Sequence, residues 1–357
     1  MSIWLLLKFV GGLALLVGGA SWLVNGASRF AAAAGVAPLV IGLTVVAYGT
    51  SAPELAVSVQ AAFAGSAGVA LGNVVGSNIF NVLVVLGLSA LIAPLAVDRD
   101  LLRRDIGVMI AVSAALMALA ADGNVGRLDG LGLAAAGVLY TAWLARSART
   151  GDEPAAEPAS LFPNRGLARA GAQLVGGFAA LILGAAWLVD SATAWAQALG
   201  VSDLIIGLTV VAAGTSLPEV AASAAAALRG ERDLALGNVV GSNIFNILFV
   251  LGLAAALSPD GVDVSVGARR HDLPIMLATA VVCLPIAFTK TQIDRWEGGL
   301  LLGGYLSYSV WLFLSATEHE AAGLYSDWMV WIVIPLTGLM LFGLAFQQWR
   351  RGSSAKG

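Results

Sequence analysis

Charged side chains are scarce in this chain: they make up 11% of its 357 residues, whereas 59% are hydrophobic and the mean hydropathy is +0.87. Soluble domains carry about 25% charged residues, so the composition excludes that class and indicates an integral membrane protein with many spans. The sequence also lacks a basic tail and any patch of interleaved basic and aromatic residues. We therefore expect no nucleic-acid partner.

Cysteine and histidine are nearly absent. The single cysteine, Cys283, excludes an intramolecular disulfide and a thiolate metal cluster. His271 and His319 both lie in polar connections between apolar stretches, which argues against a zinc site or a histidine base within the membrane. We therefore expect no resident cofactor and no catalytic histidine within the membrane.

The most informative feature present is an internal duplication. Residues 42–54 read GLTVVAYGTSAPE, and residues 207–219 read GLTVVAAGTSLPE. Each copy is followed by an identical LGNVVGSNIFN, at 71–81 and at 236–246. The two duplicated motifs, 42–81 and 207–246, place an acidic residue and several hydroxyls in apolar surroundings, which is costly in a membrane and points to function.

Eleven apolar stretches are long enough to cross about 30 Å of hydrocarbon. The first five and the next five belong to the two copies, at 1–147 and 168–316, which a polar linker at 148–167 joins. The eleventh stretch, at 325–349, has no counterpart. The predicted fold class is an all-α polytopic membrane protein with a ten-helix core of two five-helix repeats and an extra C-terminal transmembrane helix.

An odd number of spans in each repeat predicts that the second repeat is inverted relative to the first. With the N-terminus outside and the C-terminus in the cytoplasm, most Lys and Arg residues lie on the cytoplasmic side. Only Arg127, Arg269 and Arg270 lie in connections on the opposite side. The positive-inside rule favours this orientation, and we expect a prokaryotic inner (plasma) membrane.

A proline interrupts the second and the seventh span. Pro53 and Pro218 each directly precede a glutamate, Glu54 and Glu219. A proline inside a helix removes one N–H and clashes with the carbonyl four residues earlier, so each helix is expected to kink or unwind. Freed carbonyls beside a carboxylate are suitable ligands for a hard cation.

Polar residues recur at helical spacing around these glutamates and on the following span. Residues three, four or seven apart share one face of a helix, so each group forms a polar stripe. The stripes consist of Thr50, Ser51, Glu54 and Ser58, of Ser77 and Asn81, and of their counterparts Thr215, Ser216, Glu219, Ser223, Ser242 and Asn246. Packed together, they would line a cavity with two carboxylates and no cationic side chain. Carboxylate, hydroxyl and amide oxygens suit Ca2+ or Na+.

Structural alternatives exist for several of these residues. A single membrane glutamate could be protonated and purely structural, but two at equivalent positions, each beside Thr-Ser and Pro, favour function. Ser58 and Ser223 could bond back to their own helices. The asparagines outside the four stripes could bind ions or tie helices together; these are Asn73, Asn78, Asn238 and Asn243.

At these motifs the chain resembles the cation/Ca2+ exchanger superfamily, specifically its Na+/Ca2+ exchanger branch. The resemblance implies four ion sites in a diamond, with the first and sixth spans sliding together to alternate access. It implies side-chain ligands at Ser51, Glu54, Ser77, Asn81, Ser216, Glu219, Ser242 and Asn246. It implies main-chain ligands at Ala47, Thr50, Ala212 and Thr215. Asn246 stands where several relatives have aspartate, so the cavity holds two carboxylates rather than three, which disfavours K+ dependence.

The function that follows is secondary active antiport, with Ca2+ exchanged for Na+ by alternating access. An H+/Ca2+ antiporter is the main alternative. A Ca2+ channel is disfavoured by the duplicated, closed site. The expected partners are Ca2+, Na+ and the lipid bilayer, with no obligate protein partner.

Overall fold

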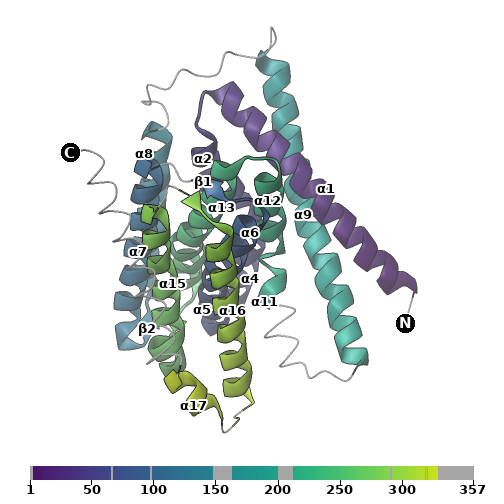
Figure 1. Ribbon diagram of the computed structural model, residues 1–357. Helices are drawn as coiled ribbons and strands as arrows, with labels where there is room; N and C mark the ends of the chain where they lie inside the picture. The colour runs from purple at the N-terminus through teal and green to yellow at the C-terminus, as the bar shows by residue number, and fades with distance from the viewer. Residues whose placement is uncertain are drawn as a thin grey trace, which may run out of the picture.

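A computed structural model describes residues 3–65, 67–96, 99–147, 163–199, 212–289, 292–317, 319 and 321–328. Within these ranges the protein is mostly helical, and two long helices, α1 and α9, cross one another beside a bundle of the others (Figure 1). Most of the expected linker, at 148–162, lies outside the described residues. So do residues 329–349 of the expected extra helix.

The helices of the first half are α1 (Ile3–Ala34), α2 (Pro38–Ile41), the π-helix η1 (Gly42–Val46), α3 (Ala47–Thr50), α4 (Ala52–Phe63), α5 (Ala67–Phe80), the π-helix η2 (Asn81–Leu86), α6 (Gly87–Ile92), α7 (Arg99–Leu119), the 3-10 helix η3 (Ala120–Asp122) and α8 (Arg127–Ser147). Those of the second half are α9 (Pro163–Ala198), α11 (Ala212–Gly214), α12 (Leu217–Leu228), α13 (Arg232–Phe245), the π-helices η5 (Asn246–Leu251) and η6 (Ala268–Asp272), α14 (Gly252–Leu257), α15 (Leu273–Thr289), α16 (Arg295–Ala316) and α17 (Ala321–Trp328).

Seven helical stretches in the described part of the chain are long and apolar enough to cross a membrane, fewer than the eleven expected. A pair bent by 47°, Pro38–Thr50 with Ala52–Phe63, adds an eighth if it is one span. The expected seventh span is described only from Ala212, and the ninth contains α15, which has 17 residues and continues directly from η6. The seven stretches are Ile3–Ala33, Ala67–Ile92, Arg104–Asp122, Arg127–Arg146, Leu167–Trp195, Arg232–Leu257 and Arg295–Ser315.

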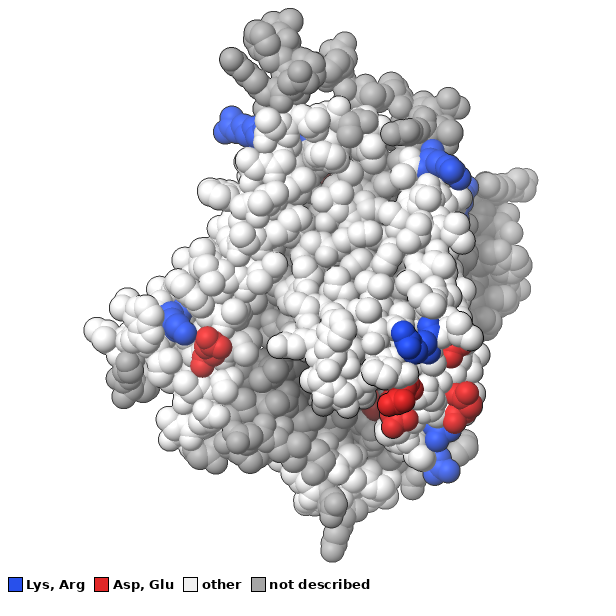
Figure 2. Space-filling view, turned by 180° about the vertical axis from the view of Figure 1, so that it is seen from behind, with Lys and Arg blue, Asp and Glu red and all other residues white. Residues whose placement is uncertain are grey.

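The surface of the bundle is apolar and polar groups lie inside it. Leu139 is 71% exposed and Val175 70% exposed, whereas Glu54 and Glu219 are both fully buried. Figure 2 shows charged side chains confined to a few places on one face, with a wide uncharged area between them. This arrangement suits a protein whose flanks contact lipid and whose ligands are handled internally.

Helices α1 and α9 approach so closely that glycine is required between them. Gly12, Gly19 and Gly26 recur every seven residues and therefore stay on one face of α1. A Cβ atom at Gly12 would lie 2.9 Å from the carbonyl oxygen of Gly184, and one at Gly19 would lie 3.0 Å from that of Gly177. Small residues let helix backbones approach in this way in membranes.

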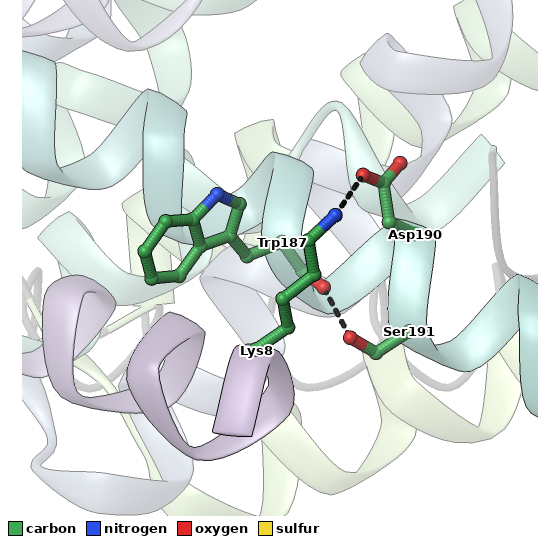
Figure 3. Close-up of polar contacts among 4 residues, drawn as sticks. All are labelled: Lys8, Trp187, Asp190 and Ser191. Carbon is green, nitrogen blue, oxygen red and sulfur yellow. Dashed lines mark hydrogen bonds and ion pairs between the residues drawn. The ribbon is translucent and has the colours of Figure 1, made fainter. Parts of the chain in front are cut away.

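A polar contact lies near the N-terminal end of α1. The Nζ atom of Lys8 lies 3.3 Å from Oδ2 of Asp190 on α9, while Ser191 donates to the carbonyl oxygen of Trp187 within its own helix (Figure 3). Because Lys8 and Asp190 are partly exposed, this ion pair contributes little to stability. The glycine packing, rather than this pair, joins the two helices.

The two halves contact one another reciprocally. A Cβ atom at Gly87 on α6 would lie 3.0 Å from the carbonyl oxygen of Gly298 on α16. One at Gly252 on α14 would lie 3.1 Å from the carbonyl oxygen of Gly130 on α8. Gly252 is the duplicate of Gly87, 165 positions later. Each half of the chain therefore contributes one helix to each of these two close contacts.

Two short antiparallel strand pairs repeat this reciprocity. Strand β1 (Leu95–Ala96) pairs with β4 (Gln292–Ile293), with Leu95 opposite Ile293. Strand β2 (Asn124–Val125) pairs with β3 (Val262–Asp263), with Val125 opposite Val262. Each pair therefore joins one half of the chain to the other.

Candidate functional site

The site is built around two interrupted helices. Ser51 separates α3 from α4 with φ −83° and ψ 11°, and Ser216 precedes α12 with φ −90° and ψ 7°. Pro53 and Pro218 are the second residues of the new helices, where the missing N–H breaks no helical hydrogen bond. The expected kink is confirmed in the first copy by the 47° bend.

The interruption decides where the glutamates lie. Glu54 and Glu219 occupy the first turns of α4 and α12, where the positive end of the helix dipole favours a negative charge. Each carboxylate is held by a serine from the other half of the chain. Ser51 Oγ donates to Glu219 Oε1 over 2.8 Å, and Ser216 Oγ donates to Glu54 Oε1 over 3.2 Å.

The second oxygen of each carboxylate is free. Oε2 of Glu54 and Oε2 of Glu219 are buried and accept no hydrogen bond within the described part of the chain. An unpaired buried acceptor costs about 1–3 kcal/mol, and more when it is charged. These two oxygens are therefore positions where a cation would relieve an unfavourable state.

The two asparagines of the polar stripes follow the same rule. Asn81 Nδ2 donates to Asn243 Oδ1 over 3.2 Å, and Asn246 Nδ2 donates to Asn78 Oδ1 over 3.1 Å. The remaining amide oxygens, Oδ1 of Asn81 and Oδ1 of Asn246, are buried without a partner among the described residues. Each half thus contributes one carboxylate oxygen and one amide oxygen that are available to a cation.

Hydroxyl groups complete the set predicted from sequence. Ser242 Oγ and Thr215 Oγ1 are buried and have no partner in the ranges that the structure covers. Thr50 Oγ1 lies 3.1 Å from Asn238 Oδ1 and 3.1 Å from the carbonyl oxygen of Val46. Ser77 is 3% exposed on α5. These groups can offer oxygen lone pairs beside the carboxylates.

The main-chain positions differ in how far they are described. The carbonyl oxygen of Ala47 accepts the N–H of Ser51 over 3.0 Å and also lies 3.3 Å from Oγ1 of Thr50. Ala212 is the first described residue of the second motif and begins α11. The backbone of Thr50 ends α3 at the break.

The asparagines that could bind ions or tie helices have distinct contacts. Asn73 Nδ2 donates to Ser58 Oγ over 2.9 Å, and Asn238 Nδ2 donates to Ser223 Oγ over 2.9 Å. These bonds join α5 to α4 and α13 to α12, which is the helix-tying alternative. Ser58 and Ser223 accept them from the neighbouring helix.

The sequence did not reveal the π-helical turns beside the site. η2 begins at Asn81 and η5 begins at Asn246, so each stripe asparagine lies where the helical ladder widens. Such turns are rare in proteins as a whole, but those that do occur are often found at functional sites. Glycines of the second motif also bring backbones together, since a Cβ atom at Gly237 would lie 2.7 Å from the carbonyl oxygen of Leu39.

The chemistry of the site is that of a hard-cation site. Its donors are carboxylate, amide and hydroxyl oxygens, which suit Ca2+ and Na+ better than softer metals. Within the described ranges no three His, Cys, Asp or Glu residues lie together, so neutral oxygens make up most of the donor set. Two carboxylates in a buried site require a compensating positive charge.

The sodium/calcium exchanger protein family matches residues 4–146 and 170–314, which include both motifs. The chain belongs to this family. Members of the family are transporters, and this exchanger-family chain is an integral membrane protein.

Individual relatives cover most of the chain. Inner membrane protein YrbG of Escherichia coli (strain K12) is 38% identical over 285 residues, which is 78% of this chain and 86% of the relative. Sodium/calcium exchanger MaX1 of Methanosarcina acetivorans is 34% identical over 317 residues, covering 78% of this chain and 90% of the relative. The putative antiporter CaxA of Alkalimonas amylolytica is 39% identical, covering 78% and 89%.

The fold also has an experimental counterpart. The structure of the sodium-calcium exchanger NCX_Mj, soaked with 10 mM Na+ and zero Ca2+, matches with a TM-score of 0.76 at 33% identity. The match covers 86% of this exchanger-family chain and 98% of NCX_Mj. The arrangement of helices described above is therefore similar to that of a known exchanger.

Proposed function

We propose that this protein is a secondary active antiporter that exchanges Ca2+ for Na+ by alternating access. The observation that carries the proposal is the pair of fully buried glutamates, each with one oxygen bonded to a serine of the other half and one oxygen free. Two such carboxylates balance the charge of one Ca2+. Emptied of Ca2+, they repel each other and must accept Na+ or H+ in its place, which is the physical basis of antiport.

The proposed ligands are the twelve residues predicted from the sequence. Their side chains or carbonyl oxygens lie on helices that the Ser51–Glu219 and Asn81–Asn243 hydrogen bonds join to one another. The set consists of Ala47, Thr50, Ser51, Glu54, Ser77, Asn81, Ala212, Thr215, Ser216, Glu219, Ser242 and Asn246.

The architecture in this proposal is two inverted five-helix repeats, at 1–147 and 168–316. The strand pairs support the inversion. β1 follows α6 and β2 follows α7, so they lie at opposite ends of the bundle (Figure 1). β3 follows α14, the duplicate of α6, yet it pairs with β2 rather than lying beside β1. The ends of α6 and α14 then face opposite sides of the membrane, as inversion requires.

Alternating access in this proposal comes from α1 and α9 moving together past the bundle. Their glycine contacts make them one unit, and both adjoin the interrupted helices: a Cβ atom at Gly49 would overlap the ring of Phe178 on α9. The N-terminus is proposed to lie outside and the C-terminus in the cytoplasm of a prokaryotic inner membrane.

Transport by the purified protein in sealed vesicles tests the proposal. Radioactive Ca2+ should accumulate when an outward Na+ gradient is imposed, and accumulation should stop when the gradient is collapsed. Ca2+ uptake that follows a pH gradient and ignores Na+ would identify an H+/Ca2+ antiporter instead. Na+-independent unitary currents in a planar bilayer would identify a channel.

A further inference from the structure

We propose that Asn78 and Asn243 are positioning residues that hold the amides of Asn246 and Asn81 with their oxygens toward the transported cation. This inference rests on the proposed function and adds to it two residues that orient ligands of the cation without being ligands themselves. All four side chains are at most 2% exposed. They lie on α5 and η2 in the first half and on α13 and η5 in the second.

The reasoning begins with what an amide can offer. A primary amide has an NH2 group that only donates and an oxygen that only accepts, and the two are on opposite sides of the same group. Only the oxygen can bind a cation. A buried asparagine therefore serves as a ligand only if something fixes which of its two ends faces the ion.

Asn78 and Asn243 provide that constraint from across the boundary between the halves. The side-chain oxygen of Asn243 accepts a hydrogen bond from the NH2 group of Asn81. The side-chain oxygen of Asn78 accepts one from the NH2 group of Asn246. With its nitrogen held this way, each stripe amide leaves its Oδ1 atom unpaired and buried. A flipped amide would instead bring two oxygens together and turn an NH2 group toward the cation.

The positioning residues are themselves fixed by a further layer. Asn78 Nδ2 donates to the carbonyl oxygen of Asn243 over 3.1 Å and lies 3.8 Å from the sulfur of Met276. Asn243 Nδ2 donates to the sulfur of Met109 over 3.4 Å. Because these contacts use their nitrogens, Asn78 and Asn243 can present only their oxygens to the stripe amides.

The acceptors for the NH2 groups of Asn78 and Asn243 include two buried methionine sulfurs. Met109 on α7 and Met276 on α15 are each 1% exposed. A thioether is a weak acceptor that never donates. It can therefore orient an NH2 group without competing for the cation.

Ca2+ affinity of the purified full-length protein in lipid nanodiscs tests the inference through a double-mutant cycle. Asn243→Leu should weaken Ca2+ binding by about tenfold to a hundredfold, the usual effect of removing a residue that orients a metal ligand. In an Asn81→Ala background, where no amide remains to be oriented, the same substitution should cause little further loss. Asn78→Leu should behave likewise against Asn246→Ala.

Additive losses in these cycles would overturn the inference, because a residue that merely supports the helix would weaken both backgrounds equally. Met109→Leu keeps the volume of the side chain and removes only the sulfur acceptor. Combined with Asn81→Ala, it gives a second cycle of the same design, with a smaller expected loss of Ca2+ affinity. This second cycle tests the inference if Asn243→Leu does not fold. Ser89→Ala is the matched control, since the hydroxyl of this buried serine bonds to the Val85 carbonyl in its own helical stretch.

The same experiment distinguishes failure of the proposed function from failure of the positioning role. Wild-type protein that binds no Ca2+ in the nanodisc would overturn both the antiport proposal and the positioning role. Wild-type protein that binds Ca2+, together with cycles that show no coupling, would overturn the positioning role alone.

Discussion

Ser51 donates a 2.8 Å hydrogen bond to Glu219, which lies 168 positions further along the chain. The hydroxyl therefore acts on the carboxylate of the other half rather than on Glu54 in its own motif. Ser216 and Glu54 form the equivalent bond, 162 positions apart. Each half of the chain orients the charged ligand of its partner.

Removal of either charge should abolish Ca2+ transport. Glu54→Gln and Glu219→Gln keep the shape of the side chain and an oxygen that can accept the serine hydrogen bond, so folding should be preserved. Each leaves a single carboxylate to balance a divalent ion. Na+-driven Ca2+ uptake should fall to background in both variants.

Glu231→Gln is the matched control for these two variants, because Glu231 is the N-cap residue of α13 and lies outside the site. It should transport normally. Near-normal uptake by Glu54→Gln or Glu219→Gln would contradict the assignment of the site.

Loss of the anchoring hydroxyls should weaken Ca2+ binding without abolishing it. Ser51→Ala frees the carboxylate of Glu219, and Ser216→Ala frees that of Glu54. Hydrogen bonds to charged groups are worth about 1.5–3 kcal/mol, which corresponds to roughly tenfold to a hundredfold in affinity. Equilibrium Ca2+ binding should give losses of similar size for both variants, and a large loss in only one would contradict the reciprocal arrangement.

A third carboxylate at position 246 should make stability depend on bound cations. Asn246→Asp replaces the donated N–H of Asn246 with a charged oxygen that faces Asn78 Oδ1 and adds to the charge of Glu54 and Glu219. Repulsion among these groups should lower the thermal unfolding temperature in cation-free buffer. Saturating Ca2+ should restore it, because a ligand that binds only the folded state stabilises that state.

Differential scanning fluorimetry with and without Ca2+ measures this effect. The shift produced by Ca2+ should be larger in Asn246→Asp than in the wild type. An unchanged unfolding temperature in cation-free buffer would show that position 246 tolerates a charge and that Asn78 can turn to accommodate it.

The contact between α1 and α9 can be tested with two adjacent glycines. Gly19→Ala would place a Cβ atom 2.9 Å from that of Ala180, whereas a Cβ atom at Gly18 would meet nothing within 4 Å among the described residues. Overpacking typically costs about 1–3 kcal/mol. Gly19→Ala should therefore lower the unfolding temperature and slow exchange, while Gly18→Ala should do neither.

The sequence predicted which residue types form this site better than it predicted which of them are hydrogen-bonded to one another. The duplicated motifs predicted the buried glutamates, the polar stripes and the kink at Pro53, because residue type, spacing and proline geometry are local properties. They did not predict that Ser51 would bond to Glu219, since a repeat identifies equivalent residues but not which of them meet. That depends on how the halves pack.

Other features could not be predicted because nothing local encodes them. The π-helical turns that begin at Asn81 and Asn246 read NVLVVL and NILFVL, and apolar runs of this kind are equally compatible with an ordinary α-helix. Asn78 and Asn243 looked equally suited to ion binding or helix tying until their partners were known. The expected eleven spans exceed the seven found in the described ranges partly because the bent second span is not one straight helix.

The exchange of hydrogen bonds across the two halves has a consequence for how such a site could originate. Each copy of the motif carries a carboxylate, an amide, and a serine and an asparagine that orient such groups. The serine and the asparagine of one copy, however, act on the carboxylate and the amide of the other copy. A chain of half this length would therefore need to associate with a second copy of itself before its carboxylate and amide were oriented in this way.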